Sequence, residues 1–432
     1  MKIAFFSPVS PQKTGIADYS EQEILPYLSK YCDIDVYIDP RVKPSNPYLI
    51  NNFDCFSYKD YKNKADEYDI PLYQMGNNEY HAFIYDSLLK YPGITVLHDI
   101  YLHGFLWSQS LAKGDSRRYI SEFEYCYGSP GVKLAEYAIS SGAYPEFTHP
   151  LIKRIIDRSA GVICHSEFGI RKVLMEQPNS TCTVIPQPFS RNTQSDDIKQ
   201  SEKEHILKKI GMENTFPIVT SFGYISAHKR YDIILSVFKK ILEIYPTAVF
   251  IIVGQDKIGL SNKIHELELE NHVIIKGFVT HDILVEILNI TDFCINLRYP
   301  TAGETSRSVL QIMSHGKPVI VSNVGWFSEL PDNSCLKVDV DSYQNSVLSE
   351  FFQLLTDNKK IRDAIGRNGK DFVIKNHDPE VAAKMYYQFI KNVLNGDEMI
   401  INTISRSFFD LGLKDSDNKT IMSQISKIKD IL

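Results

Sequence analysis

The sequence predicts an α/β protein made of two doubly wound parallel-sheet domains that face a central cleft. The chain has 432 residues, more than one ordinary hydrophobic core accommodates. Short β-rich runs alternate with amphipathic segments, a pattern typical of parallel sheets covered by helices. The alternation stops near Phe189, a polar stretch SRNTQSDDIKQSEKE follows, and the alternation then restarts. Two domains joined by a surface linker explain this order.

The same breaks divide the chain into five segments. They are a first α/β domain over residues 1–190, a linker over 191–206, a second α/β domain over 207–380, a helix over 381–397 expected to pack back towards the first domain, and a helical tail over 398–432. One helical face of the tail is apolar and carries Ile421, Ile425, Ile428 and Leu432. That face is expected to pack on the body of the protein, with docking to a membrane surface or a partner subunit as the alternative.

The strands of both halves are expected from their apolar runs. In the first half these are KIAFFS, DIDVYI, PLYQMG, GITVLHD, AGVICHS and CTVIPQP, and in the second half FPIVTSFGY, TAVFIIVG, HVIIKG, DFCINL and KPVIVS. Helices are expected between them, most clearly over YDIILSVFKKILEIY, where apolar residues recur at helical spacing. Because open α/β sheets bind ligands off the carboxyl ends of their strands, functional residues should directly follow strands.

Composition excludes several classes of function. The net charge of -6 argues against nucleic acid or an anionic membrane as an electrostatic partner. The 7 cysteines are scattered singly without metal or redox spacing, as expected of buried thiols in a reducing compartment. No stretch approaches about 18 consecutive apolar residues, and the apolar part of the N-terminus is too short for a signal peptide, so we expect a cytoplasmic protein. Neither a G-x-x-x-x-G-K-[ST] loop nor a G-x-G-x-x-G after the first strand is present.

Two loops of the first half follow strands and carry candidate residues. In SPVSPQKTGIADYS, Gly15 precedes a helix expected to open at Asp18 or Tyr19, so backbone N–H groups there are candidates for facing a phosphate or sugar. An ordinary surface loop is the alternative for Gly15. In GITVLHDIYLHGF, His98 is a candidate to donate to a substrate hydroxyl, with Asp99 and His103 on the acceptor or sugar side. Turn capping is the alternative for Asp99, and a zinc site is only weakly indicated.

A basic pair follows the first strand of the second half. In SFGYISAHKRYD, Gly223 allows a close backbone approach, and Lys229 and Arg230 place two cations just before a helix. A helix N-terminus is already positive, so helix electrostatics does not explain them, whereas an anionic diphosphate would. A solvated basic pair is the alternative.

An acid stands ahead of a helix in RYPTAGETSRSVLQIMSHGKPVI. Arg298 ends the preceding strand, and Ser306 or Thr305 is expected to cap the helix. The helix N-terminus alone would stabilise Glu304 by roughly 0.3–1 kcal/mol, which is a purely structural explanation. The alternative places Glu304 in the same cleft as Lys229, where it would bind sugar hydroxyls.

Taken together, these motifs resemble a retaining glycosyltransferase of the GT-B fold, family 4 (glycosyl transferases group 1). The resemblance spans about residues 1–395 and includes HSEFG, VIPQP, FGYISAHKR and the GETS loop followed by GKPVIVSNVG. It implies an acceptor-side first domain and a second domain that binds a nucleotide sugar. The GETS variant resembles a subgroup associated with bacterial surface-polysaccharide assembly of the O-antigen (lipopolysaccharide) or capsule type.

The resemblance assigns a role to each candidate position. Lys229 matches the lysine on the donor diphosphate, Gly15 the loop near the phosphates, and His98 the histidine near the transferred sugar. With Lys229, His98 and Glu304 as the catalytic set, the donor-binding set is Gly15, Gly223, Arg230, Gly277, Phe278, Val279, Arg298, Gly303, Thr305, Ser306, Ser308 and Gln311. Gly277 to Val279 match a segment near the base, and Thr305 to Ser308 the helix start that receives the phosphate.

The sequence departs from the family pattern at two points. The family commonly has two glutamates seven residues apart, the second of which holds the ribose. Here Gln311 occupies the second position, and Glu304 is displaced by one from the first, which is Gly303. Tyr224 replaces a basic residue, and Arg230 or Arg298 is expected to take over part of its work.

The implied reaction is front-face transfer of a hexose to a saccharide or lipid-linked saccharide, with retention of configuration. The nucleotide sugar is a co-substrate, family frequency favours GDP-mannose, and neither a divalent metal nor another cofactor is expected. We expect a cytoplasmic enzyme, with peripheral association at the inner face of the cytoplasmic membrane or with a complex through the tail as an option. The alternatives are a nucleotide-sugar epimerase or phosphorylase on the same fold, and a catalytically silent nucleotide-sugar-binding scaffold.

Overall fold

The computed structural model describes residues 1–190, 208 and 214–396. The predicted linker over 191–206 and the predicted tail over 398–432 lie outside these residues. No helix in the described part of the chain has an apolar stretch long enough to cross a membrane.

The first domain is built on a seven-stranded, wholly parallel sheet in the order β3-β2-β1-β4-β5-β6-β7. Its strands are β1 (Lys2–Phe6), β2 (Asp33–Ile38), β3 (Cys55–Ser57), β4 (Ile70–Met75), β5 (Gly93–Leu97), β6 (Ser159–Cys164) and β7 (Cys182–Val184). All six predicted strands are present, and the unpredicted β3 is only three residues long.

Helices cover both faces of this sheet, and several of them are short. They are α1 (Gly15–Asp18), a π-helix η1 (Tyr19–Ile24), α2 (Leu25–Leu28), α3 (Pro47–Asn52), α4 (Ala82–Lys90), α5 (His103–Gln109), α6 (Ser116–Ser141), α7 (Lys153–Arg158) and α8 (Glu167–Glu176). Short 3-10 turns η2 (Tyr58–Asn63), η3 (Ala65–Glu67), η4 (Glu79–His81) and η5 (Leu111–Lys113) connect them. The helix after the first strand begins at Gly15, not at Asp18 or Tyr19, because the Thr14 hydroxyl caps it by accepting from the Ile16 N–H.

The second domain has a six-stranded parallel sheet in the order β10-β9-β8-β11-β12-β13. Its strands are β8 (Ile218–Phe222), β9 (Val249–Val253), β10 (Val273–Gly277), β11 (Phe293–Asn296), β12 (Val319–Ser322) and the unpredicted β13 (Leu336–Val338). Its helices are η6 (Ala227–Lys229), α10 (Tyr231–Ile244), α11 (Leu260–Glu266), α12 (His281–Ile290), α13 (Arg307–Ser314), η7 (Gly325–Glu329), α14 (Gln344–Asp357) and α15 (Lys359–Asn376).

Each sheet is buried on both faces, which is why its strands read as continuous apolar runs. Along β1, Ile3 and Phe5 join one core cluster while Ala4 and Phe6 join the cluster on the opposite face. In the second sheet, Phe250 of β9 faces one cluster and Ile251 the other. Core clusters on both faces of each sheet therefore hold the strand ends in place.

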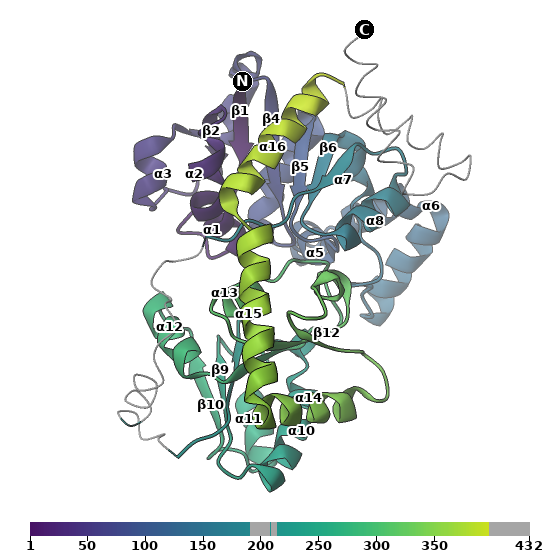
Figure 1. Cartoon of the computed structure of the whole chain (residues 1–432). Helices are drawn as coiled ribbons and strands as arrows, with labels where there is room; N and C mark the ends of the chain where they lie inside the picture. Colours follow the sequence, from purple (N-terminus) through teal and green to yellow (C-terminus); the bar gives the residue numbers. More distant parts are fainter. Residues whose placement is uncertain (191–207, 209–213, 397–432) are drawn as a thin grey trace, which may run out of the picture.

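The last helix returns to the first domain. α15 runs along the second domain, and α16 (Pro379–Leu394) continues over the first (Figure 1). Tyr386 and Phe389 of α16 join the core that contains Ile3 and Phe5, and the Tyr386 hydroxyl lies 2.6 Å from that of Tyr19. The chain passes between the domains twice, after Phe189 and again between α15 and α16. The two segments are hydrogen-bonded to each other, because the Phe189 N–H donates to the His377 carbonyl over 2.8 Å.

Candidate active site

The two domains meet through the loops that follow their strands. The Ile100 and Tyr101 N–H groups, after β5, donate to the Ala302 carbonyl, after β11, over 2.9 and 3.1 Å. The Glu329 carboxylate, after β12, accepts from the Glu167 and Phe168 N–H groups, after β6. The carboxyl ends of the two sheets therefore face each other, where open α/β sheets place their ligands.

Three of the predicted residues, Gly223, Lys229 and Ser308, lie close together in the second domain. Gly223 has φ +101°, and a Cβ added there would lie 2.9 Å from Lys229 Nζ and 3.3 Å from Ser308 Oγ. The loop after β8, the turn η6 and the start of α13 therefore converge on one point. Only a glycine leaves this space open with the backbone in that conformation.

Lys229 is buried, with only 3% of its surface exposed. Its amino group donates to the Phe222 carbonyl at the end of β8. Burial first, and then the neighbouring Arg298 cation, hold the pKa of Lys229 well below its usual value. These contacts exclude the solvated basic pair for Lys229.

Arg230 contacts Asp232 and Tyr299. It has φ +55° and precedes α10, and its guanidinium lies 3.8 Å from Asp232 Oδ1 and 5.8 Å from the Tyr299 ring centroid. Arg298 is the arginine that the structure brings to the lysine. Of the two residues expected to replace the basic residue missing at Tyr224, Arg298 is therefore the better placed.

Glu304 is paired with Arg298. The Arg298 Nε atom lies 3.2 Å from Glu304 Oε1, and the Thr301 hydroxyl donates to Glu304 Oε2 over 2.9 Å. The helix that follows begins at Arg307 and is capped by Ser306, whose hydroxyl accepts from the Val309 N–H. Glu304 thus stands ahead of the cap with its own partners, and helix electrostatics alone does not account for its position.

His98 is turned into the first domain. Its Nε2 atom lies 2.8 Å from the Gln74 amide and its Nδ1 atom 3.3 Å from His165 Nε2. The amide oxygen of Gln74 is an acceptor, so His98 Nε2 donates to it, and His165 Nδ1 donates to the Ile185 carbonyl. Burial first, and then His165, lower the pKa of His98 well below its usual value, which keeps the ring neutral. A sugar hydroxyl reaches His98 only by displacing one of these partners.

Asp99 faces the second domain. Its Oδ2 atom accepts from the Asn77 N–H over 2.8 Å. Burial and then the charge of Glu304 raise the pKa of Asp99 to about 6. His103 is separated from it in the first domain, where its Nε2 atom lies 2.8 Å from the Tyr119 hydroxyl. In the described part of the chain no group of three or more His, Cys, Asp or Glu residues is arranged to hold a metal ion.

The remaining predicted residues lie at strand ends or helix starts. Gly15 opens α1 and is exposed, with open space around it. Gly277 ends β10 with φ +64°, followed by the exposed Phe278 and the half-buried Val279. Gln311 lies half-buried on α13, and the buried Thr305 hydroxyl has no hydrogen-bond partner among the described residues. An unpartnered buried hydroxyl beside Ser306 and Ser308 is consistent with a ligand at this helix start.

Sequence reasoning missed the ion pair between Arg307 and Glu23. Arg307 Nη1, at the first turn of α13, lies 2.8 Å from Oε1 of Glu23, which is 1% exposed in the π-helix of the first domain. No local signal identifies this pair, because its members are far apart in the sequence and lie in different domains. It ties the predicted phosphate-receiving helix to the first domain.

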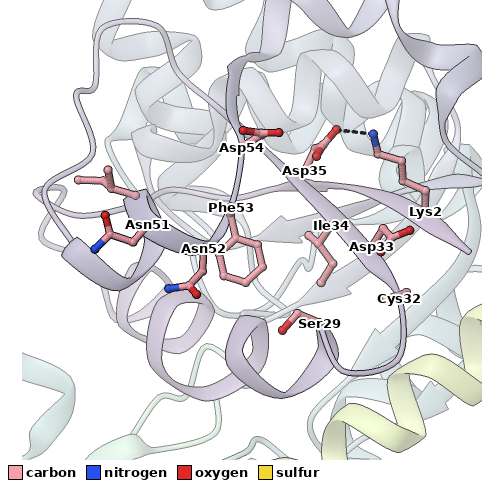
Figure 2. Close-up of a pocket in the computed structure, with 11 residues that line it drawn as sticks. Lys2, Ser29, Cys32, Asp33, Ile34, Asp35, Asn51, Asn52, Phe53 and Asp54 are labelled. Carbon is pink, nitrogen blue, oxygen red and sulfur yellow. Dashed lines mark ion pairs between the residues drawn. The ribbon is translucent and has the colours of Figure 1, made fainter.

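A hollow lies at the other end of the first sheet, away from the predicted site residues. Its volume is about 550 Å³, and Lys2, Asp33 and Asp54 on its wall stand at or before the first residues of β1, β2 and β3 (Figure 2). Lys2 and Asp35 form an ion pair there at 2.8 Å. The amino ends of parallel strands lie away from the loops that carry the predicted residues.

Gly303 of the second domain packs closely against two residues of the first domain. It has φ +79°, and an added Cβ would lie 2.8 Å from Ile100 Cβ and 3.1 Å from Phe168 Cε1. We expect Gly303→Ala to lower turnover at least about tenfold, because the methyl group holds the domains apart and a misplaced reacting group is costly. Nucleotide binding, measured by calorimetry, should survive.

Gly259→Ala is the matched control for Gly303→Ala. Gly259 also has a positive φ, of +69°, but an added Cβ there would meet no atom closer than 3.7 Å. An equal loss of turnover in the two variants would show that backbone strain, not domain contact, causes the loss in Gly303→Ala.

Comparisons with known proteins agree with this architecture. Residues 202–392 match the model of a family described as glycosyl transferases group 1. The structure is similar to that of HepE from Anabaena in complex with UDP-glucose, with 16% sequence identity over 92% of this chain and 100% of that chain and a TM-score of 0.61. It is also similar to sucrose-phosphate synthase from Thermosynechococcus elongatus, with 15% identity over 92% and 100% of the two chains and a TM-score of 0.62.

A third similar structure is WaaG, described as a glycosyltransferase involved in lipopolysaccharide biosynthesis. It is 13% identical over 89% of this chain and 99% of that chain, with a TM-score of 0.56. No curated protein matches the chain in sequence. The likenesses confirm the predicted GT-B fold, two parallel-sheet α/β domains with facing strand ends.

Proposed function

We propose that this chain is a retaining glycosyltransferase that moves a hexose from a nucleotide-sugar donor to a saccharide or lipid-linked saccharide acceptor. The observation that carries this proposal is the buried Lys229 amino group beside Gly223 and Ser308, close to the Arg298–Glu304 pair. A lysine beside the Gly223 backbone and the start of α13 suits a diphosphate. The carboxylate of Glu304, just before that helix, suits sugar hydroxyls. The family match over residues 202–392 supports the same activity.

In the proposed reaction, binding and charge stabilisation do most of the work. Lys229, Ser308 and the N–H groups at the start of α13 receive the leaving diphosphate, and Arg298 adds a second positive charge beside it. Glu304, held by Arg298 and Thr301, accepts from the hydroxyls of the transferred sugar. The acceptor hydroxyl enters on the side that the diphosphate leaves and passes its proton to a phosphate oxygen. Closure of the loops around Ala302 and Ile100 excludes water, which would otherwise hydrolyse the donor.

The identity of the donor is part of the proposal. HepE binds UDP-glucose, and family frequency favours GDP-mannose, so these two donors should be tested first. We further propose that the transfer needs no divalent metal and that it serves bacterial surface-polysaccharide synthesis, a role supported by the likeness to WaaG. Peripheral association with the cytoplasmic membrane through residues 398–432 belongs to the same proposal.

A panel of nucleotide sugars tests the function. The purified protein is mixed with UDP- and GDP-linked hexoses, with and without octyl glycosides as acceptors and with and without EDTA, and the released nucleotide is measured. We expect one donor to release nucleotide faster when an acceptor is present, and EDTA to leave the rate unchanged.

Two outcomes of the panel would contradict the transferase. Turnover of donor without any acceptor dependence would indicate an epimerase or a phosphorylase, the latter with added phosphate. Binding of a nucleotide sugar without any turnover would indicate a scaffold.

A further inference from the structure

A second cavity, of about 320 Å³, lies in the first domain beside the proposed active site. Its wall is formed mainly by aromatic side chains, those of His103, Trp107, Tyr144 and Phe147, together with Asn77 and Glu146. None of these residues except His103 was singled out in the sequence, because the aromatic members come from α5 and from the segment after α6. The volume lies at the lower end of the range of small-ligand sites.

Asn77 connects this cavity with the active site. Its N–H donates to Asp99 Oδ2 over 2.8 Å, while its side-chain Oδ1 accepts from the Phe105 N–H over 2.8 Å. A Cβ added at Gly104 would lie only 3.1 Å from Asn77 Oδ1, so the glycine allows α5 to approach this amide. One residue thus touches the predicted sugar-side acid on one side and lines the cavity on the other.

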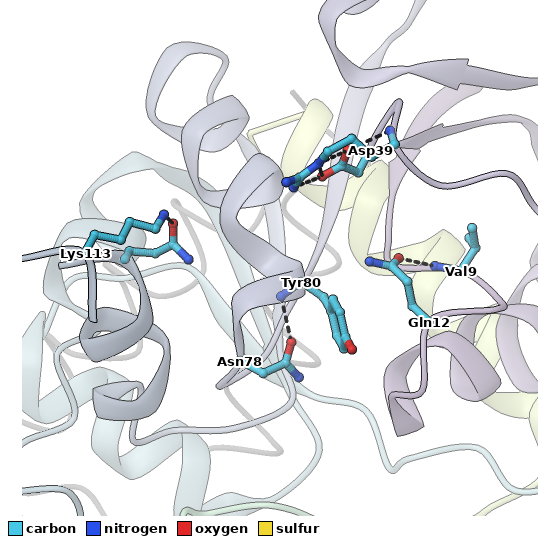
Figure 3. A network of polar contacts seen from close by, with 8 residues as sticks. Val9, Gln12, Asp39, Asn78, Tyr80 and Lys113 are labelled. Atoms are coloured by element: carbon cyan, nitrogen blue, oxygen red, sulfur yellow. Dashed lines mark hydrogen bonds and ion pairs between the residues drawn. The ribbon is translucent and has the colours of Figure 1, made fainter. Parts of the chain in front are cut away.

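Local hydrogen bonds lie next to the segments that carry Asn77 and α5. After β4, the Asn78 side chain accepts from the Tyr80 N–H over 3.0 Å and fixes the turn that carries Asn77 (Figure 3). At the end of α5, the Lys113 ammonium donates to the Gln109 side chain over 2.8 Å (Figure 3). A site that is already formed loses little entropy when a ligand binds.

One ring of the aromatic wall, that of Trp107, is exposed where an ordinary core residue would be covered. Trp107 is 45% exposed, whereas Trp326, the other of the two tryptophans, is 4% exposed. The rings of His103 and Tyr144 lie 5.6 Å apart, and burial lowers the pKa of His103 to about 4, so the imidazole is neutral. A flat apolar surface with a polar edge matches one face of a sugar ring, which presents C–H groups.

The polar groups of the cavity select against an anionic ligand. Glu146 is the one charged residue on its wall, and it would repel phosphates and carboxylates. The Asn77 side-chain amide nitrogen has no hydrogen-bond partner in the described part of the chain, and it can donate to a hydroxyl. Neutral polyols fit this combination of one acid, one amide and four aromatic rings.

We propose that this cavity is an acceptor subsite that binds a neutral sugar unit against Trp107. This inference rests on the proposed function and specifies its acceptor: a saccharide with an uncharged ring next to the ring that reacts. Asn77 then couples occupancy of the subsite to Asp99 at the active site.

Tryptophan fluorescence tests binding directly. Wild type and Trp107→Phe are titrated with the methyl α-glycosides of glucose, mannose and galactose and with maltose. We expect at least one saccharide to change the wild-type emission saturably and to leave the emission of Trp107→Phe, which retains Trp326, unchanged. Equal signals from the two proteins, or no signal from any of these saccharides, would overturn the subsite.

Kinetics provides the second measurement. With the donor found in the panel and octyl maltoside as acceptor, Trp107→Ala should raise the acceptor KM by about tenfold or more and leave the donor KM within about twofold, as for loss of an aromatic anchor. Tyr137→Ala is the matched control, because Tyr137 is an exposed aromatic residue of α6 outside the cavity. An unchanged acceptor KM in Trp107→Ala would refute the proposal.

The two proposals fail in different ways. If UDP and GDP do not bind in calorimetry and no donor is turned over, the glycosyltransferase itself is wrong. If a nucleotide binds and its donor is turned over but Trp107 senses no saccharide, only the subsite is wrong.

Discussion

Lys229→Ala is expected to lower kcat by about 10²–10³-fold and to weaken nucleotide binding as well. Loss of one preorganised donor to a developing negative charge has an effect of this size in a site closed to water. Lys229 is buried beside Gly223 and Ser308, where the diphosphate is proposed to bind. Rates are measured with the donor identified in the panel, and affinity is measured by calorimetry with UDP and GDP.

Lys240→Ala is the matched control for Lys229→Ala. Lys240 is an exposed lysine on α10, away from the strand ends. Full activity of Lys229→Ala, or an equal loss in both variants, would contradict the diphosphate site.

The lowered pKa of Lys229 adds a pH signature to the same site. In the free protein, burial and Arg298 favour the neutral amine, whereas a bound diphosphate favours the ammonium. Between the lowered pKa and the usual value of 10.5, nucleotide binding should therefore take up a proton, and affinity should fall as pH rises. Calorimetry in two buffers of different ionisation heat measures this uptake, which should be absent in Lys229→Ala.

The stability of the free protein should show the opposite dependence on pH. In the same window the unfolded chain binds a proton at Lys229 and the folded chain does not, so the contribution of Lys229 to the free energy of unfolding rises with pH. Comparing urea unfolding of wild type and Lys229→Ala at several pH values isolates this contribution. An identical pH dependence in the two proteins would contradict the lowered pKa.

Glu304→Gln is the second large effect, with an expected loss of about 100-fold in kcat/KM and little change in nucleotide affinity. The amide keeps the shape of the side chain but removes the charge that pairs with Arg298 at 3.2 Å, and a half-buried arginine without a charged partner is costly. Nucleotide affinity should change little, because the influence of Glu304 on Lys229 is smaller than that of burial or of Arg298. This split separates a sugar-side acid from a diphosphate-side cation.

The loss of Glu304 should also be visible at Asp99. The pKa of Asp99 is raised to about 6 by burial and then by the charge of Glu304, so in Glu304→Gln it should move back towards its usual value. Glu243→Gln, an exposed acid on α10, is the control. If Glu304→Gln keeps full activity while Lys229→Ala loses it, the sugar-side assignment of Glu304 is wrong, and Asp99 is the next candidate.

Most of the fold was accessible from local pattern. Eleven apolar runs in the sequence correspond to eleven of the strands, and the two strands that were missed, β3 and β13, have three residues each. Such short strands contain too few residues for a hydrophobic pattern to be recognised in the sequence. They become apparent only through their pairing with a neighbouring strand. The helix at Tyr231–Ile244 was equally clear, because one face of it is buried along its whole length.

The positions of the candidate residues were easier to predict than their partners. Position after a strand made His98, Lys229 and Glu304 candidates, because the carboxyl ends of parallel strands share one edge. The orientation of His98 towards Gln74 and His165 was not foreseen. Its partners come from β4 and from the residue after β6, and no spacing in the sequence relates them.

The sequence by itself determined the two parallel sheets and the loops that carry polar groups, because periodicity and strand ends are local properties of the chain. Only the tertiary structure decided which partner each of these polar groups contacts. Burial places Lys229 on the Phe222 carbonyl, and proximity pairs Glu304 with Arg298. The pair between Arg307 and Glu23 forms only when the two domains meet. Such pairings depend on distances between residues remote in sequence, and on exclusion of water, which the order of residues along the chain does not express.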